Sequence, residues 1–144
     1  MSAYNLQRFL IGQAENYDKA VQELTNGKVT GRWMWYVFPQ LRFFGQSQTA
    51  YFYGLDGLAE TKAYCQHETL HARYLQCCRI LEDLPIQDSV KIFGLIDSLK
   101  LCSSLTLFYH VDEDNRELYQ KLLDKFYDGC FDANTLQLMQ NESE

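Results

Sequence analysis

The chain has no internal repeat, no low-complexity segment and no run of apolar residues long enough to cross a membrane. A membrane-spanning helix needs about 20 consecutive, mostly apolar residues. The first residues also lack the apolar region of a secretory signal. These absences argue against a membrane-spanning protein, and we expect a cytoplasmic globular one.

Positive charge is also scarce. The chain has 13 Lys and Arg residues against 19 Asp and Glu residues, which gives a net charge of −6 and a pI near 5.0. A protein that neutralises many phosphates needs a basic surface, and no cluster of Lys and Arg is present. We therefore expect no general binding to DNA or RNA. A single local anion site is still allowed, because it needs only one or two cations and some backbone N–H groups.

The cysteines do not indicate disulfide bonds. There are five of them, an odd number, without a Cys-x-x-Cys motif, and Cys77 and Cys78 are adjacent. We expect all five to be reduced and most to be buried. Cys65, His67 and His71 could contribute to a zinc site, but their spacing matches no established pattern and a fourth ligand is missing. We expect neither a metal nor a cofactor.

Apolar and aromatic residues are abundant. Hydrophobic residues make up 47% and aromatic residues 15% of the 144 residues. A chain of this length supports one domain with one hydrophobic core. We assign residues 1–144 to a single domain with its core in residues 4–138. We expect the acidic end, residues 139–144, to fray.

Apolar residues recur at helical spacing through most of the chain, and no segment alternates with period two for long. Residues 6–24 show the helical pattern and precede Asn26-Gly27, a natural helix stop. The sequence therefore predicts an all-α domain of six to eight helices joined by short loops. Residues suited to begin these helices are Asn5, Thr30, Ser47, Asp56, Asp88, Asp97 and Asp132.

The densest aromatic segment is residues 32–40, RWMWYVFPQ, which contains both tryptophans. Pro39 must end a helix near Phe38. A strand is the alternative for residues 33–38, but no partner strand is apparent, so we predict a short helix. Its indoles either fill the core, where each N–H needs a partner, or line a pocket where one indole stacks on a flat ligand. In the pocket, Gln40 would contact the polar edge of that ligand.

A second informative segment is residues 97–108, DSLKLCSSLTLF. On a helix, Asp97, Lys100, Ser103 and Ser104 share one side. Serine is unfavourable inside helices because its hydroxyl competes for backbone hydrogen bonds. Either the hydroxyls face a pocket in which Lys100 holds an anion, or Asp97 pairs with Lys100 on a solvated face and the serines bond to helix carbonyls. A Ser103–Lys100 nucleophile would need a lysine whose pKa is lowered toward neutrality.

Together the two segments predict a site for a small anionic, nucleotide-like ligand such as ADP-ribose or a compound derived from NAD. Hydrolysis of this ligand is a further option, although no acid–base pair stands out. The alternative is a non-catalytic protein–protein interaction domain whose Trp and Ser motifs form the core. The candidate ligand-binding residues are Trp33, Trp35, Gln40, Asp97, Lys100, Ser103, Ser104, Arg8 and Gln13.

Several motifs follow one another in an order typical of a known family. They are Trp33-Met34-Trp35, Phe38-Pro39-Gln40, Ile92-Phe93-Gly94, Asp97 with Lys100, Ser103-Ser104 and Thr106-Leu107-Phe108. From Tyr4 to about Leu138 the chain resembles the domain-of-unknown-function 1810 family of small bacterial and fungal proteins. The resemblance implies an all-helical domain with a shared polar site, and it implies no particular activity. Some members carry the label calpastatin, but calpastatin-type inhibitors are disordered, unlike this compact aromatic sequence.

The chain departs from the family pattern just before the first tryptophan. The family usually has Ser-His where this chain has Gly31-Arg32. If that histidine serves as an acid or base in relatives, this chain lacks it. Other departures are Glu68, His71 and Leu105, where the family tends to have Pro, Gly and Met.

Overall fold

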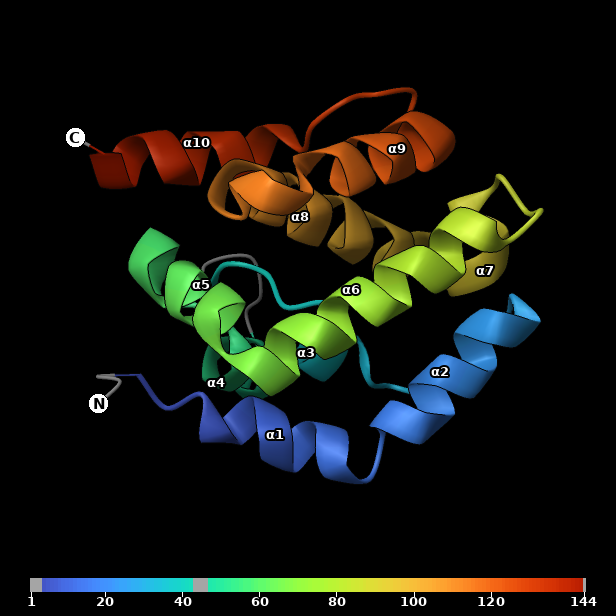
Figure 1. Ribbon diagram of the computed structural model, residues 1–144. Helices are drawn as coiled ribbons and strands as arrows, with labels where there is room; N and C mark the ends of the chain where they lie inside the picture. Colours follow the sequence, from blue (N-terminus) through green and yellow to red (C-terminus); the bar gives the residue numbers. More distant parts are fainter. Residues whose placement is uncertain (1–3, 43–46, 144) are drawn as a thin grey trace.

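The structure is a computed structural model that describes residues 4–42 and 47–143. Within these ranges the regular elements are helices, apart from one isolated parallel β-bridge between Leu41 and Leu55. The prediction of an all-α fold is therefore confirmed, and the helices pack around one shared core (Figure 1). None of the described helices is long and apolar enough to cross a membrane.

The described residues form ten α-helices, so the prediction of six to eight helices was too low. A short 3₁₀ helix, η2 (Glu113–Asn115), lies between α8 and α9. The α-helices are α1 (Gln7–Ala14), α2 (Tyr17–Asn26), α3 (Met34–Val37), α4 (Gln48–Tyr53), α5 (Gly57–Gln66), α6 (Glu68–Asp83), α7 (Ser89–Phe93), α8 (Leu95–Val111), α9 (Arg116–Tyr127) and α10 (Ala133–Ser143).

The count is higher in part because Glu15 and Asn16 interrupt a segment that looks continuous in the sequence, whereas the sequence already placed two helices on either side of His67. The segment 6–24 is divided between α1 and α2 at Asn16, whose side-chain amide donates a hydrogen bond to the Gly12 carbonyl (2.7 Å). His67 separates α5 from α6, and its Nδ1 accepts a hydrogen bond from the Leu70 N–H (3.2 Å). Such side-chain bonds to the backbone compete locally with helix continuation.

Three of the predicted helix starts are confirmed by capping hydrogen bonds. In each, a side-chain oxygen accepts from a backbone N–H of the first turn, which satisfies one of the donors that a helix leaves free. The pairs are Ser47 with Ala50 (3.0 Å), Asp88 with Val90 (3.0 Å) and Asp132 with Thr135 (2.9 Å).

Helix α8 is the centre of the fold. It packs against α3, α5, α7, α9 and α10, while α6 contacts α2, α5 and α9 (Figure 1). Every residue from 101 to 108 is buried. A helix that is apolar on nearly all sides belongs in a core, which explains its central position.

Aromatic rings fill the space between α6 and α8. The rings of Tyr74 and Phe108 are stacked with centroids 3.9 Å apart and an interplanar angle of 13°. Phe38 meets Tyr74 edge-on at 5.5 Å, and Tyr119 of α9 does so at 5.9 Å. These four rings form a continuous aromatic cluster in the core.

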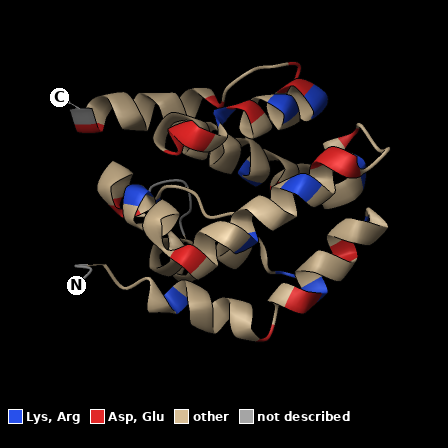
Figure 2. Cartoon of the chain, viewed as in Figure 1, with Lys and Arg blue, Asp and Glu red and all other residues tan. Residues whose placement is uncertain are grey.

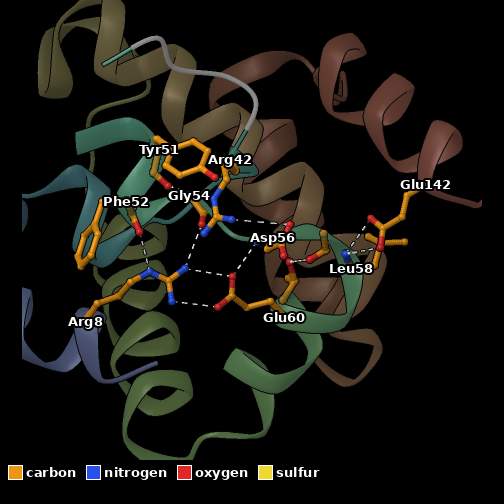
Figure 3. A network of polar contacts seen from close by, with 11 residues as sticks. Arg8, Arg42, Tyr51, Phe52, Gly54, Asp56, Leu58, Glu60 and Glu142 are labelled. Atoms are coloured by element: carbon orange, nitrogen blue, oxygen red, sulfur yellow. Dashed lines mark hydrogen bonds and ion pairs between the residues drawn. The ribbon is translucent and has the colours of Figure 1, made fainter. Parts of the chain in front are cut away.

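Arg8 on α1 forms a buried ion pair with Glu60 on α5 (Figure 3). Two guanidinium nitrogens donate to the two carboxylate oxygens at 2.9 and 3.0 Å. The same guanidinium donates to the carbonyls of Phe52 (2.7 Å), Gly54 (3.0 Å) and Asn5 (2.5 Å). These bonds tie α1 to α5 and to the end of α4, so the environment of Arg8 is structural.

The end of the chain docks against α5. We predicted fraying for residues 139–144; residues 139–143 lie in α10, and residue 144 lies outside the described residues. Both carboxylate oxygens of Glu142 accept hydrogen bonds from the Leu58 N–H, at 3.0 and 2.9 Å (Figure 3). An acidic side chain at the first turn of a helix is favoured by the helix dipole.

Candidate functional site

A cavity of about 580 Å³ lies between α3 and the junction of α7 and α8. Its lining includes part of the tryptophan segment, residues 32–40, and the start of the polar segment, residues 97–108. Its walls are mostly apolar, with two basic residues and one acidic residue. The lining residues are Arg32, Met34, Trp35, Phe93, Gly94, Leu95, Ile96, Asp97 and Lys100.

Gly94 shapes this site because it is the single residue between the end of α7 and the start of α8. Its φ of +82° lies in a region that residues with a Cβ rarely adopt. Because glycine has no side chain, it cannot cap α8, and the first N–H groups of a helix have no partner within the helix. The amino-terminal turn of the 17-residue α8 therefore borders the cavity with backbone donors.

The lysine of the cavity lies over an indole. Lys100 Nζ is 4.2 Å from the centroid of the Trp35 ring, which is a cation–π distance, and 3.3 Å from Asp97 Oδ1. Its charge is thus already shared with a carboxylate. Arg32, by contrast, is exposed and has no ion-pair or hydrogen-bond partner in the described part of the chain. Arg32 is therefore the uncompensated cation of the cavity.

Trp33 has a different environment from Trp35. Its side chain is buried, with the residue 1% exposed, and its Nε1 donates to Glu23 Oε1 at 3.0 Å. The same oxygen accepts from the N–H groups of Thr30 (2.8 Å) and Gly31 (2.9 Å). Burial by itself raises the pKa of Glu23, but these hydrogen bonds outweigh that effect and the pKa lies below its ordinary value. The core interpretation holds for this indole.

We expect Glu23→Gln to lower the free energy of unfolding near neutral pH by about 1–2 kcal/mol, because a charged acceptor of three N–H groups is lost. A carboxylate with a lowered folded-state pKa stabilises the protein above its unfolded-state pKa. That contribution is lost as the pH falls through the folded-state value, which lies below 4.5. The difference between the two proteins should thus shrink in acid. Urea unfolding at several pH values measures it.

The control for this experiment is Glu117→Gln, which removes an 88% exposed carboxylate. We expect it to change the stability by less than about 0.5 kcal/mol. A difference between wild type and Glu23→Gln that is the same in acid and at neutral pH would contradict the proposed role of the ionised carboxylate.

The two serines of α8 bond within the protein. Ser104 is fully buried and its Oγ is 2.8 Å from the Tyr74 hydroxyl. Ser103 Oγ donates to the Leu99 carbonyl at 3.2 Å. Neither is among the described residues that line the cavity. The bonding of Ser103 to a helix carbonyl and the Asp97–Lys100 pair match the structural interpretation of this segment.

The amide candidates also lie in the core. Gln13 donates to the Tyr36 carbonyl (2.6 Å) and accepts from Arg73 (3.1 Å). Gln40 is 5% exposed, and its backbone carbonyl accepts from the Leu55 N–H at 2.9 Å. The structure thus brings three of the nine predicted site residues together at the cavity: Trp35, Asp97 and Lys100. It places the other six elsewhere: Trp33, Gln40, Ser103, Ser104, Arg8 and Gln13.

Several residues of the cavity were not among the sequence candidates. Leu95 and Ile96 are 65% and 69% exposed although they are large and apolar. Their signal in the sequence is their place directly after Gly94, on a helix whose buried residues begin at Ser98. The missed lining residues are Arg32, Met34, Phe93, Gly94, Leu95 and Ile96.

The cysteines and histidines follow their predicted pattern in part. All five cysteines, which lie in the described ranges, are free, and three of them are buried. Burial raises the pKa of Cys77 to about 12, so its thiol stays protonated. His67 caps α6, whereas His71 bonds to Asp112 at 2.7 Å. Among the described residues, no three His, Cys, Asp or Glu side chains are grouped so that they could hold a metal ion.

Comparison with known proteins places the chain in a family. The family described as "Protein of unknown function (DUF1810)" matches residues 3–139. The crystal structure of the conserved hypothetical protein Rv1873 from Mycobacterium tuberculosis is 40% identical in sequence, with 96% of this chain and 99% of that chain covered and a TM-score of 0.93. No curated protein matches the sequence significantly. The chain therefore belongs to the DUF1810 family.

Proposed function

We propose that the cavity between α3 and the α7–α8 junction binds a small anionic ligand of the nucleotide class. The observation that carries this proposal is the meeting of an uncompensated arginine, an indole and the amino-terminal turn of a long helix in one cavity. Its volume of about 580 Å³ lies in the range of small-molecule sites.

The anionic group of the ligand has a natural position at the start of α8. Backbone N–H groups and the positive end of the helix dipole together favour phosphate or carboxylate there. Arg32 borders the same cavity and can bond an anion through two nitrogens at once. We therefore assign the anion to Arg32 and the helix start. Lys100, the residue that the sequence suggested for this role, is shared with Asp97.

The flat part of the ligand would contact Trp35 and the apolar wall formed by Phe93 and Ile96. One face of the indole already carries the Lys100 ammonium, so a base would stack on the other face or displace the lysine. Asp97 is the one carboxylate among the described lining residues, and it is paired with Lys100. A single carboxylate that is already bonded to a lysine gives no acid–base pair for hydrolysis. We therefore propose ligand binding without catalysis.

We expect Arg32→Ala to weaken binding of ADP-ribose, NAD or a nucleoside diphosphate by about tenfold or more, because it removes the free cation. Quenching of Trp35 fluorescence during titration measures the affinity. Stability should be nearly unchanged, since the residue is exposed. Lys91→Ala is the matched control: Lys91 is an exposed cation on α7 that does not line the cavity.

Two results would count against the anion site. One is the absence of any fluorescence response to nucleotides, ADP-ribose, NAD and sugar phosphates. The other is an equal loss of affinity in Arg32→Ala and Lys91→Ala, which would show that only the overall charge matters.

We infer a second candidate function, self-association, from exposed apolar residues at the start of α8, two of which also line the cavity. Leu95, Ile96 and Leu99 on one side of α8 are 65%, 69% and 59% exposed. Contiguous exposed apolar residues are typical of interaction surfaces. Leu99 does not line the cavity, so Leu99→Ser separates the two candidates. It should abolish a dimer seen by sedimentation velocity and leave ligand titration unchanged. A monomeric wild-type protein would contradict the dimer.

A further inference from the structure

A second cavity, of about 560 Å³, lies at the carboxyl-terminal end of α8. It is formed by the end of α8, the start of α6, one side of α5 and the turn toward η2. Its polar lining residues include Lys62, His71, His110, Asp112, Glu113 and Asp114. None of these belongs to the anion site at the other end of the helix.

A buried carboxylate fixes the orientation of His71 in this cavity. Asp112 is 8% exposed, and its Oδ2 accepts from His71 Nε2 (2.7 Å), Asn115 Nδ2 (3.0 Å) and the Tyr119 hydroxyl (2.5 Å). Burial raises the pKa of Tyr119, so its hydroxyl is a donor. Because a carboxylate only accepts, the hydrogen of the His71 ring lies on Nε2 whenever the ring is neutral. Its Nδ1 is then an acceptor.

His110 is fixed in the same way by a backbone carbonyl. Its Nδ1 is 2.8 Å from the Thr106 carbonyl oxygen, which can only accept, so Nδ1 carries the hydrogen. The Nε2 of the neutral ring is an acceptor. Two imidazoles in the lining of one cavity thus each have one acceptor nitrogen that their structural hydrogen bond leaves free.

The charges around the cavity favour a cation. Among the described lining residues, the three carboxylates of Asp112, Glu113 and Asp114 stand against a single Lys or Arg, Lys62. The carboxyl-terminal end of a helix adds a partial negative charge. A metal ion is not the expected occupant, because no group of three potential ligands exists among the described residues. An organic cation fits the volume and the acceptors.

We propose that this cavity binds a protonated primary amine. An ammonium group donates three hydrogen bonds. The free nitrogens of His71 and His110 and the carboxylate of Asp114 supply acceptors for them, and the carboxylates balance the charge. The two ends of α8 would then serve ligands of opposite charge, an anion at its start and an amine at its end. The amine site does not depend on the anion site.

The test uses the full chain and putrescine as the probe, with tetramethylammonium as the control cation. Tetramethylammonium has a positive charge but no N–H donor. Histidine ring signals in NMR spectra report binding for each imidazole. Putrescine should shift the signals of His71 and His110 in a saturable manner and leave those of His67, the cap of α6, in place. Equal shifts with tetramethylammonium would overturn the proposal.

His71→Gln tests the acceptor nitrogen and replaces the neutral imidazole by a neutral amide. Its side-chain NH2 can still donate to Asp112, but its acceptor, the amide oxygen, no longer occupies the position of Nδ1. We expect the affinity for putrescine to fall about fivefold or more. An unchanged affinity would overturn the assignment to His71.

A second pair of variants tests the site without changing His71 or Asp112. Asp114→Asn removes an exposed lining carboxylate, and Glu117→Gln removes an exposed carboxylate that does not line the cavity. We expect the first to weaken putrescine binding about threefold more than the second. Equal effects would show attraction by overall charge and would refute the site. Arg32→Ala should leave putrescine binding unchanged, whatever it does to nucleotides.

Discussion

The Arg8→Ala variant is expected to lose about 3–5 kcal/mol of unfolding free energy, because it breaks a buried ion pair. Glu60 is 2% exposed and would be left buried without its cationic partner. The carbonyls of Phe52 and Gly54 would lose their donor at the same time. Urea unfolding followed by circular dichroism measures the loss.

Arg42→Ala is the matched control, because Arg42 also bonds to a carbonyl and faces a carboxylate (Figure 3). Its Nη1 is 3.9 Å from Asp56 Oδ1, and the two side chains are 21% and 58% exposed. We expect a loss below about 1 kcal/mol, since exposed ion pairs contribute little. A comparable loss in both variants would show that burial of the Arg8 pair does not matter.

The double variant Arg8→Met with Glu60→Leu separates the ion pair from its burial. Removing both charges leaves no unpaired ion, so the double variant should be more stable than Arg8→Ala alone by about 1–2 kcal/mol. It should remain below the wild type, because the carbonyls of Phe52 and Gly54 still lack a donor. A double variant that is less stable than the single one would contradict this account.

Arg8 also shows where sequence reasoning ends. Its charge suggested a ligand contact, but its partner lies 52 residues away on another helix. No local pattern encodes such a distant pair. The fold class was predictable because helical periodicity and caps depend on neighbouring residues. The number of helices was not, because a break such as the one at Asn16 depends on a single side-chain hydrogen bond.

The candidate site likewise has one contact that the sequence could indicate and one that only the fold reveals. The Asp97–Lys100 pair is three residues apart on one helix, and the sequence indicated it as one of two alternatives. The contact of Lys100 with Trp35 joins α8 to α3 and required the fold. The roles of the serine hydroxyls of α8 could not be assigned from the sequence. A serine between packed helices and a serine that lines a pocket give the same sequence pattern. Ser104 meets Tyr74 of α6, so its hydroxyl satisfies a buried tyrosine.

The positively charged residues are dispersed over the whole chain. Lys and Arg are spread over several helices instead of gathering on one of them (Figure 2). The local anion site therefore depends on one arginine and one helix terminus. The composition permitted such a site but could not locate it, because the backbone donors at the start of α8 depend on the turn at Gly94.

Trp33→Ala is expected to lower the free energy of unfolding by about 3–5 kcal/mol, whereas Trp35→Ala should cost clearly less. Trp33 is 1% exposed, packs against Phe38 with centroids 6.4 Å apart, and its N–H bonds to Glu23. Trp35 is only partly buried and borders the cavity. Urea unfolding of both variants, followed by circular dichroism, measures the difference.

The same two positions separate core from pocket when ligand binding is measured. Trp33→Phe leaves Trp35 as the one indole, and nucleotide titration should still quench its fluorescence. Trp35→Phe should remove that response, because Trp33 is sealed in the core behind its bond to Glu23. Quenching that survives in Trp35→Phe and disappears in Trp33→Phe would reverse the assignment. The ligand would then have to open the core to reach Trp33.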